Sequence, residues 1–236
     1  MSHLRAILGI ARRTPLHPQW LLGPRKAPGA VRVAQGVVLD IGAGDRWIER
    51  LVPPEAKYVA LDYPRTALSL YGARPHILAD AASLPVRSNS VDLVVCLEVI
   101  EHVRDPESLL REVSRVLRPN GRACLSMPFI YPVHDAPHDY QRWTRHGWER
   151  SIKLHGLESV QVEETGSAVE SAGLMACLAL AGPLGAIGAW RALLVAPVAL
   201  PLILLINVGS WLISKLWFPW RGLSSGIQVE LRKPNG

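Results

Sequence analysis

Apolar residues gather in short runs between polar segments along much of the chain. The runs occupy residues 37–41, 57–61, 76–79, 91–97, 122–127 and 157–164, and a last one occupies 226–232. The run at 91–97 is apolar on both faces, which a central strand of a parallel sheet requires. Segments of helical character separate most of the runs, and this alternation predicts an α/β fold with a doubly wound, mostly parallel sheet.

Two of the separating segments carry clear helix signals. Asp105 offers an N-cap acceptor ahead of a proline, and the apolar positions 109, 113, 116 and 117 then share one helical face. Residues 144–155 form a second predicted helix, with Thr144 as its cap. Residues 64–71 are expected to form a short helix, and residues 119–121 a turn into the fifth strand.

A glycine turn follows the first predicted strand. The sequence runs from apolar residues through Asp40 to Gly42 and Gly44. Glycine allows a sharp turn and a close approach of a ligand to the backbone. Residues 45–51 can begin a helix whose first amides face that ligand. The alternative interpretation is an ordinary turn from strand to helix.

Acidic residues end four of the predicted strands, at Asp40, Asp62, Asp80 and Glu98. Asp62 follows Asp40 by 22 residues, and nucleotide-binding sheets place a ribose ligand about 20 residues beyond the glycine turn. Taken singly, each of these acids can be explained as a solvated side chain at the end of a strand. Because the carboxyl ends of parallel strands meet at one edge, we expect all four to border a single ligand site.

The charge of the chain is concentrated at its start. The formal net charge is +6, and residues 1–36 carry six Lys and Arg residues and no acid. The body is therefore balanced, and we expect no nucleic-acid groove in it. The basic arm either contacts anionic lipid or nucleic acid or is a solvated tail. The three cysteines lack metal-binding spacing and are expected to be reduced core thiols.

The combined motifs resemble the class I S-adenosylmethionine-dependent methyltransferases, in particular the type 11 methyltransferase family. The motifs are Val-Leu-Asp-Ile-Gly-Ala-Gly (38–44), Ala-Leu-Asp (60–62), Ala-Asp-Ala (79–81), Leu-Pro (84–85), Ser-Val-Asp-Leu-Val-Val-Cys-Leu-Glu-Val-Ile-Glu-His-Val (90–103) and Leu-Arg-Pro-Asn-Gly (117–121). The resemblance covers about residues 36–165 and the last strand. It implies a Rossmann-like sheet of seven strands with an antiparallel last strand. One departure is Arg46, where the family often has a third glycine.

The resemblance implies S-adenosyl-L-methionine as the cofactor. The glycines of the turn would face its methionine part, Asp62 would bind the ribose hydroxyls and Asp80 would reach the adenine edge. Glu98 would border the pocket where the methyl sulfonium meets the acceptor. The full expected cofactor-binding set is Asp40, Gly42, Gly44, Asp62, Tyr63, Asp80, Ala81 and Glu98.

Catalysis needs little beyond positioning, because a sulfonium methyl group is already activated. The enzyme must hold the acceptor, exclude water and provide a base for one proton. The candidates for the base are His102, His134, His138 and Asp139. His102 belongs to the Glu-His pair that resembles the family, where this histidine is often structural.

The loop at residues 131–144 follows the fifth strand at the edge of the expected site. His134, Asp135, His138 and Asp139 are possible zinc or iron ligands. Two prolines stiffen the loop and no third distant ligand is evident, so we expect no metal. Substrate contact, proton transfer and structural capping of the next helix remain open. The residues from Asp139 to Thr144 also resemble a segment of methyltransferases from envelope polysaccharide clusters.

An apolar insertion lies between the sixth and seventh strands. From residue 171 to residue 214 the only charge is Arg191. Residues 172–190 and 192–214 are each long enough for a membrane-spanning helix, which needs about 20 apolar residues. Tryptophans near the ends suit a membrane interface. Prolines inside the insertion are expected to kink or break it, which also suits a re-entrant or surface-lying pair.

We therefore expect three parts: a basic arm at 1–35, a methyltransferase domain at 36–170 and 223–236, and an apolar insertion at 171–222. The favoured function is a methyltransferase on the cytoplasmic side of a membrane, acting on a hydroxyl or carboxyl of a lipid, lipid-linked glycan or quinone-like acceptor. The alternatives are a soluble cytoplasmic enzyme for a small molecule with the insertion as a lid or dimer interface, and a non-catalytic cofactor-binding regulatory protein.

Overall fold

The computed structural model describes residues 12–67, 74–186, 189–218, 220 and 222–235. The chain divides into two compact units. The described part of one unit comprises residues 12–25, 130–132 and 164–226, and the other comprises residues 26–129, 133–163 and 227–236. The larger unit contains nearly all of the sheet and the predicted site residues, and the smaller unit contains the apolar insertion.

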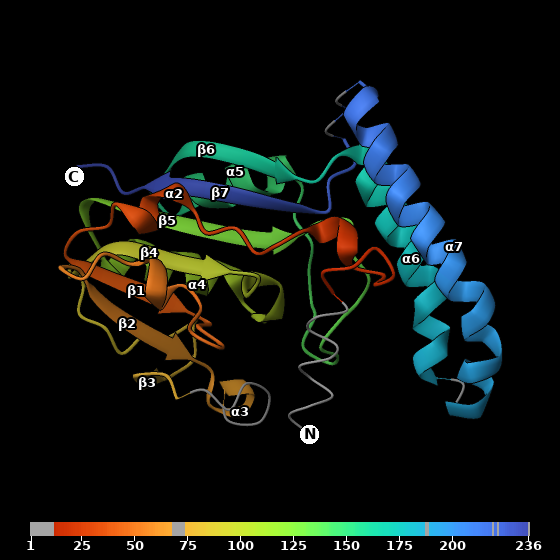
Figure 1. The fold of residues 1–236 in the computed structure, drawn as a ribbon. Helices are drawn as coiled ribbons and strands as arrows, with labels where there is room; N and C mark the ends of the chain where they lie inside the picture. Colours follow the sequence, from red (N-terminus) through yellow and green to blue (C-terminus); the bar gives the residue numbers. More distant parts are fainter. Residues whose placement is uncertain (1–11, 68–73, 187–188, 219, 221, 236) are drawn as a thin grey trace. The chain divides into compact units, whose positions relative to one another are not determined.

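The sheet has seven strands in the order β3-β2-β1-β4-β5-β7-β6. The strands are β1 Val37–Ile41, β2 Lys57–Asp62, β3 Ile77–Leu78, β4 Val91–Leu97, β5 Leu117–Pro128, β6 Glu158–Thr165 and β7 Gly226–Arg232. The pairs from β3 to β5 are parallel, and β7 runs antiparallel to its neighbours (Figure 1). The predicted α/β fold with a Rossmann-like, doubly wound sheet is confirmed.

Both well-marked helices have the predicted caps. Helix α4 spans Pro106–Val116, and Asp105 accepts a hydrogen bond from the amide of Ser108 at 3.1 Å. Helix α5 spans Arg145–Leu154, and the Thr144 hydroxyl accepts from the amide of Gly147 at 3.2 Å. Shorter elements are α2 Gly29–Arg32, α3 Pro64–Thr66 and the 3₁₀ turns η2 Glu49–Leu51 and η4 Ile100–His102. Residues 68–71, the rest of the predicted short helix after β2, lie outside the described part.

Two local predictions differ from the structure. No α-helix forms over residues 45–51, where only the 3₁₀ turn η2 occurs. Arg46 has a φ of +57°, outside the helical region, and two prolines follow the segment at 53 and 54. The expected turn at 119–121 is a register shift within β5, where Val91 pairs with Leu117 and Leu93 with Arg122.

The sheet separates two apolar layers because alternate residues of each strand point to opposite faces. Leu39 and Val94 belong to the cluster that contains the buried residues of α4 and α5. Val38 and Leu93 belong to the other cluster, which contains residues of α2. Both faces of the central strands are thus covered, as a parallel sheet requires. The three cysteines are free and buried, as predicted.

The smaller unit contains two long apolar helices that lie side by side (Figure 1). Helix α6 spans Ala168–Ala186 and α7 spans Ala189–Leu216. Helix α7 continues through Pro197 and Pro201, which were expected to kink or break the insertion. Among the described residues, one helix, Trp190–Leu216, is long and apolar enough to cross a membrane.

Residues 12–25 of the basic arm pack on this helical pair. The Asn207 side chain in α7 is completely buried, and its amide donates to the carbonyls of Pro15 and His17 at 2.7 and 3.0 Å. Trp20, in the 3₁₀ turn η1 Trp20–Leu22, lies with its ring centroid 6.4 Å from that of Trp211. The prolines at 15, 18, 24 and 28 predict a linker or an irregular wrap over residues 14–30, and the first part of this segment has a fixed partner in the helical pair. A short amphipathic helix is also predicted at residues 3–13, almost all of which lie outside the described residues.

Candidate active site

The glycine turn is fixed by contacts between β1, β2 and the segment after β4. The amides of Gly42 and Ala43 both donate to the carbonyl of Leu61, at 2.8 and 3.1 Å. Gly42 has a φ of +70°, and a Cβ at this position would lie 2.2 Å from a methyl carbon of Val99. Glycine is therefore required at position 42 for two reasons, its backbone conformation and the close packing of Val99.

Asp62 closes the turn from the end of β2. Its Oδ2 accepts from the amide of Gly44 at 2.8 Å, and its Oδ1 accepts from the amide of Tyr63 at 2.7 Å. Each carboxylate oxygen has two lone pairs, so two backbone amides orient this carboxylate and leave it able to accept from a pair of hydroxyl groups. This donor and acceptor pattern fits the ribose of an adenosyl cofactor. Binding by Asp62 itself stays a prediction.

The other expected cofactor residues lie at neighbouring strand ends. Asp80 is exposed and accepts from the amide of Ala82 at 2.9 Å, while Ala81 beside it is buried. Tyr63 is 46% exposed and follows β2 directly. An exposed carboxylate and an exposed ring next to Asp62 are compatible with an adenosyl group, and their contact with one remains a prediction.

Asp40 is directed into the protein. Its side chain accepts from the hydroxyl of Tyr58 at 2.6 Å, and the residue is only 4% exposed. Burial raises the pKa of Asp40 to about 7, against the opposing effect of the Tyr58 hydrogen bond. Tyr58 lies within the predicted second strand, but it was not predicted to be a site residue. Direct contact of Asp40 with the cofactor stays a prediction.

Glu98 stands at the end of β4 in an unusual backbone conformation, with a φ of +56°. The hydroxyl of Ser126 on β5 donates to its Oε1 at 2.6 Å, and the Glu98 amide donates to the Ser126 carbonyl at 3.2 Å. Water reaches the side chain, but surrounding protein desolvates the carboxylate. This desolvation, together with the charge of Glu101, raises the pKa of Glu98 to about 7.

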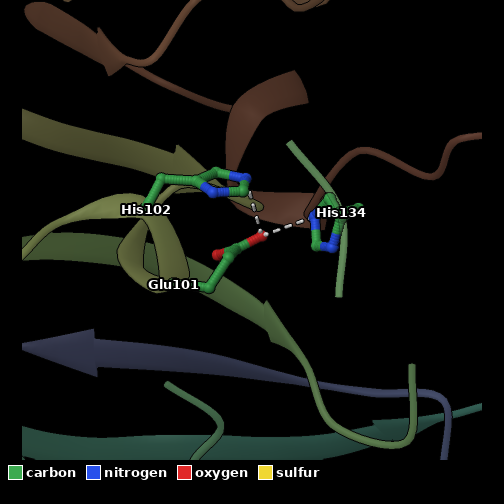
Figure 2. A group of neighbouring side chains, drawn as sticks. All are labelled: Glu101, His102 and His134. Carbon is green, nitrogen blue, oxygen red and sulfur yellow. Dashed lines mark ion pairs between the residues drawn. The ribbon is translucent and has the colours of Figure 1, made fainter. Parts of the chain in front are cut away.

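Two of the four candidate bases lie together. The rings of His102 and His134 meet edge to face with their centroids 4.9 Å apart. Both Nε2 atoms approach the same oxygen, Oε1 of Glu101, at 3.6 Å from His102 and 3.8 Å from His134 (Figure 2). The loop after β5 therefore places His134 beside the pair Glu101 and His102, which follows β4.

The other two candidates have separate partners. The ring of His138 is bonded to the hydroxyl of Tyr140 at 2.9 Å, while its carbonyl accepts from Nδ1 of His102 at 2.5 Å. Asp139 accepts two hydrogen bonds from the guanidinium of Arg142, and these bonds lower the pKa of Asp139 to about 2. A carboxylate with so low a pKa is a weak base, so Asp139 is better suited to hold the loop than to accept a proton.

Glu101 and Arg142 were not singled out from the sequence. Glu101 is part of the motif at residues 90–103, but nothing in that motif shows that its side chain would be fully buried. Arg142 lies three residues after Asp139, a spacing that is common for surface ion pairs and therefore uninformative. Both acquire significance only when β4 and the loop after β5 are placed side by side.

The fold and the strand-end site together define a class I S-adenosylmethionine-dependent methyltransferase domain. Residues 39–125 match the family model of the type 11 methyltransferases, described as a methyltransferase domain. The match lies within the larger unit and contains the glycine turn and all four strand-end acids. It identifies an enzyme domain whose cofactor is S-adenosyl-L-methionine.

Curated relatives agree over the same part of the chain. A probable S-adenosylmethionine-dependent methyltransferase of Mycobacterium tuberculosis is 38% identical over 108 residues, which are 42% of this chain and 39% of the relative. A ubiquinone biosynthesis O-methyltransferase of Aeromonas salmonicida is 31% identical over 101 residues, or 38% of this chain and 42% of the relative. The matches span about two fifths of the length of these relatives.

Solved structures extend the likeness to the whole fold. An S-adenosylmethionine-dependent methyltransferase from Mesorhizobium loti is similar at a TM-score of 0.53 and 18% identity, covering 85% of this chain and 92% of that one. The [4+2]-cyclase SpnF is equally similar, with a TM-score of 0.53, 18% identity, and coverage of 88% and 78%. At this identity the likeness shows the fold alone, and the cyclase illustrates that one fold supports different reactions.

Proposed function

We propose that this protein is an S-adenosylmethionine-dependent methyltransferase that works at a membrane and methylates an oxygen of an amphipathic acceptor. The acceptor class is a lipid, a lipid-linked glycan or a quinone-like molecule, and the location is the cytoplasmic side of the membrane. The observation that carries the membrane part is the apolar surface of α7, since the methyltransferase domain by itself is compatible with a soluble substrate.

The apolar side chains of α7 are largely exposed. The most apolar 18-residue window of Trp190–Leu216 has a mean hydropathy of 2.4, and only 17% of that window is buried. Leu193, Leu194 and Leu205 are 73%, 70% and 67% exposed. Soluble monomers rarely expose a continuous apolar patch beyond a few hundred Å², and each buried Å² of such surface contributes about 25 cal/mol. Insertion into the hydrocarbon region of a membrane would remove these apolar side chains from water and so stabilise the helix.

The connections of the insertion favour a hairpin that enters the membrane and returns. Its two ends join β6 and β7, which are neighbours in one sheet, so both ends belong on the same side of the membrane. Helix α6, Ala168–Ala186, has 19 residues, close to the roughly 20 that a complete crossing needs.

The chemistry proposed for the site is transfer of a methyl group to an acceptor oxygen. The glycine turn, Asp62 and Asp80 would hold the cofactor, which when bound supplies a methyl group already activated by its sulfonium charge. The acceptor oxygen would gain the methyl group as the methyl–sulfur bond breaks and leaves its electrons on sulfur as a thioether, and the acceptor O–H proton would pass to a base of the chain. His102 and His134 are the candidates best placed to accept it. The curated O-methyltransferases named for ubiquinone biosynthesis and for the malonyl-acyl-carrier protein support an oxygen acceptor.

The membrane part is tested by partition of the expressed chain after an alkaline carbonate wash of cell membranes. We expect the native chain to stay in the membrane pellet and Leu205→Asp to shift toward the supernatant. The matched control is Leu154→Asp, because Leu154 is 68% exposed on α5 of the other unit. Release of the native chain, or equal behaviour of the two variants, would favour the soluble enzyme with a helical lid.

The catalytic part is tested with radiolabelled S-adenosylmethionine and separated lipid, glycan and protein fractions. We expect label in a lipid-extractable fraction, with a loss of at least tenfold in His102→Ala or His134→Ala and little change in His138→Ala. Cofactor binding without any labelled fraction would support the non-catalytic alternative. Label in a water-soluble small molecule would refute the proposed acceptor class while retaining the enzyme.

A further inference from the structure

Glu101 is a buried carboxylate without a conventional partner. It has no exposed surface, and neither of its side-chain oxygens has a hydrogen bond within the part of the chain that the structure describes. A buried carboxylate that is neither hydrogen-bonded nor paired is strongly unfavourable, because burial removes its hydration. The charge of Arg142 acts on Glu101, but its guanidinium donates hydrogen bonds to Asp139. A cation in direct contact with the Glu101 oxygens would therefore be favourable.

The two imidazoles facing Glu101 approach it at an unusual distance. Their Nε2 atoms lie 3.6 and 3.8 Å from Oε1 (Figure 2), beyond the usual 2.7–3.2 Å of a hydrogen bond from nitrogen to oxygen. Bonds of about 2.0–2.2 Å to a tetrahedral metal ion would place two ligand atoms about 3.4 Å apart. The observed separations are close to that value, and all three ligand atoms lie within 4.8 Å of one another.

The tautomer of His102 also indicates a cation beside Glu101. Its Nδ1 lies 2.5 Å from the carbonyl oxygen of His138, and a carbonyl only accepts, so Nδ1 carries the proton. In a neutral ring Nε2 then presents a lone pair to Glu101, and two acceptors face each other. A cation between them, either a metal ion or a proton on one of the two groups, relieves this arrangement. A ring N–H that donates to a carbonyl is also the usual second contact of a metal-binding histidine.

His134 has a comparable setting. Its Nδ1 lies 3.2 Å from Oδ2 of Asp139 and 3.4 Å from a guanidinium nitrogen of Arg142, so either tautomer has a neighbour. The pair with Asp139 corresponds to the carboxylate–histidine–metal arrangement of many metal sites. Asp135 lies 4.0 Å from Nε2 of His102, where it or a water molecule would complete a fourth position.

We propose that Glu101, His102 and His134 form a binding site for one divalent transition-metal ion, with zinc as the best match. One carboxylate and two imidazoles form a zinc ligand set that leaves one position open. The set differs from the loop ligands that the sequence suggested, because only His134 is shared. A bound metal would occupy the Nε2 lone pairs of both histidines, so they would then act as ligands and not as the base. The metal would instead polarise an oxygen of the methyl acceptor at the open position, and that role alone rests on the proposed function.

The test uses the purified full chain, freed of metal with a chelator and titrated with Zn²⁺ by calorimetry in the absence of cofactor and acceptor. We expect one equivalent to bind with a dissociation constant below about 1 μM, and Co²⁺ to give the visible absorption of a tetrahedral complex. His102→Ala and His134→Ala should each weaken zinc binding at least 100-fold. The matched control is His138→Ala, which keeps the carbonyl that orients His102 and should change affinity less than threefold.

Circular dichroism and binding of S-adenosylhomocysteine accompany each variant, so that loss of fold is separated from loss of the metal. Absence of stoichiometric zinc binding to the native chain would overturn the proposal, and so would unchanged binding in both alanine variants. If either of these two variants does not fold, His134→Asn replaces it, since an amide of similar size retains polar contacts but is a poor zinc ligand. A native chain that binds S-adenosylhomocysteine but does not bind zinc would refute the metal site and leave the methyltransferase assignment intact.

Discussion

Replacement of Gly42 by alanine tests how the glycine turn is built. The substitution adds one methyl group at a φ of +70° and places it 2.2 Å from a methyl carbon of Val99. Gly156 offers a matched control, because its φ is +67° and nothing lies within 4 Å of an added Cβ. The two variants share the backbone strain and differ in the steric overlap.

The expected magnitudes follow from these two effects. A left-handed conformation costs an alanine about 1–2 kcal/mol, and this applies to both variants. Forcing an extra methyl group into packed surroundings costs about 1–3 kcal/mol, and this applies only to Gly42→Ala. The variant should therefore unfold about 1–3 kcal/mol more easily than Gly156→Ala, which corresponds to roughly 2–10 °C in melting temperature for a chain of this size.

Urea unfolding measures the stability difference, and calorimetry with S-adenosylhomocysteine measures the effect on the site. Gly42→Ala should also weaken that ligand at least tenfold, because Val99 and the turn must move apart, while Gly156→Ala should not. The double variant Gly42→Ala, Val99→Ala removes the overlap and should recover much of the extra loss. Equal stability of the two glycine variants, or no recovery in the double variant, would refute this account of the turn.

Three further substitutions address the ionised groups. The pKa of Asp40 is raised from 3.8 to about 7, so the native state holds this proton more tightly than the unfolded state does. The free energy of unfolding should therefore fall as pH rises from about 4 to 7. Urea midpoints measured across this pH range should show a smaller fall for Asp40→Asn. Asp139→Asn should destabilise the protein by about 1–3 kcal/mol at pH 7, because the guanidinium of Arg142 loses its two charge-assisted hydrogen bonds. The difference in free energy of unfolding should shrink below pH 4, as the native carboxylate is protonated towards its pKa of about 2. Asp62→Ala, which removes the acceptor of the Gly44 amide, should weaken S-adenosylhomocysteine at least tenfold by calorimetry; unchanged affinity would exclude Asp62 from the ribose site.

The strands were predictable because local sequence determines them. The run at 91–97 is apolar on both faces and became the central strand β4 with the same bounds. The caps Asp105 and Thr144 were also predictable, since the capping side chain bonds to an amide only three residues away. The antiparallel direction of the last strand was predicted only from the resemblance to a family, because no pattern within residues 226–232 indicates it.

Long-range contacts decide the features that the sequence did not show. The segment after the glycine turn looked helical, yet Arg46 adopts a left-handed conformation and its guanidinium bonds to Glu49 and to the carbonyl of Arg74. Asn207 looked like one polar residue in an apolar run. It is the residue through which α7 binds the carbonyls of Pro15 and His17, some 190 positions away, and no periodicity within α7 identifies that partner.

The same distinction explains why the sequence and the fold group different residues as possible metal ligands. Spacing along the chain grouped His134 with His138, but the two rings have different partners, since His138 contacts Tyr140. The fold brings His134 to Glu101 instead, 33 positions away, because the loop after β5 passes the end of β4. The proposed ligand set joins η4, which follows β4, to the loop that follows β5. A metal bound there would therefore link the loop after β5 to the end of β4, and its removal should loosen that loop first.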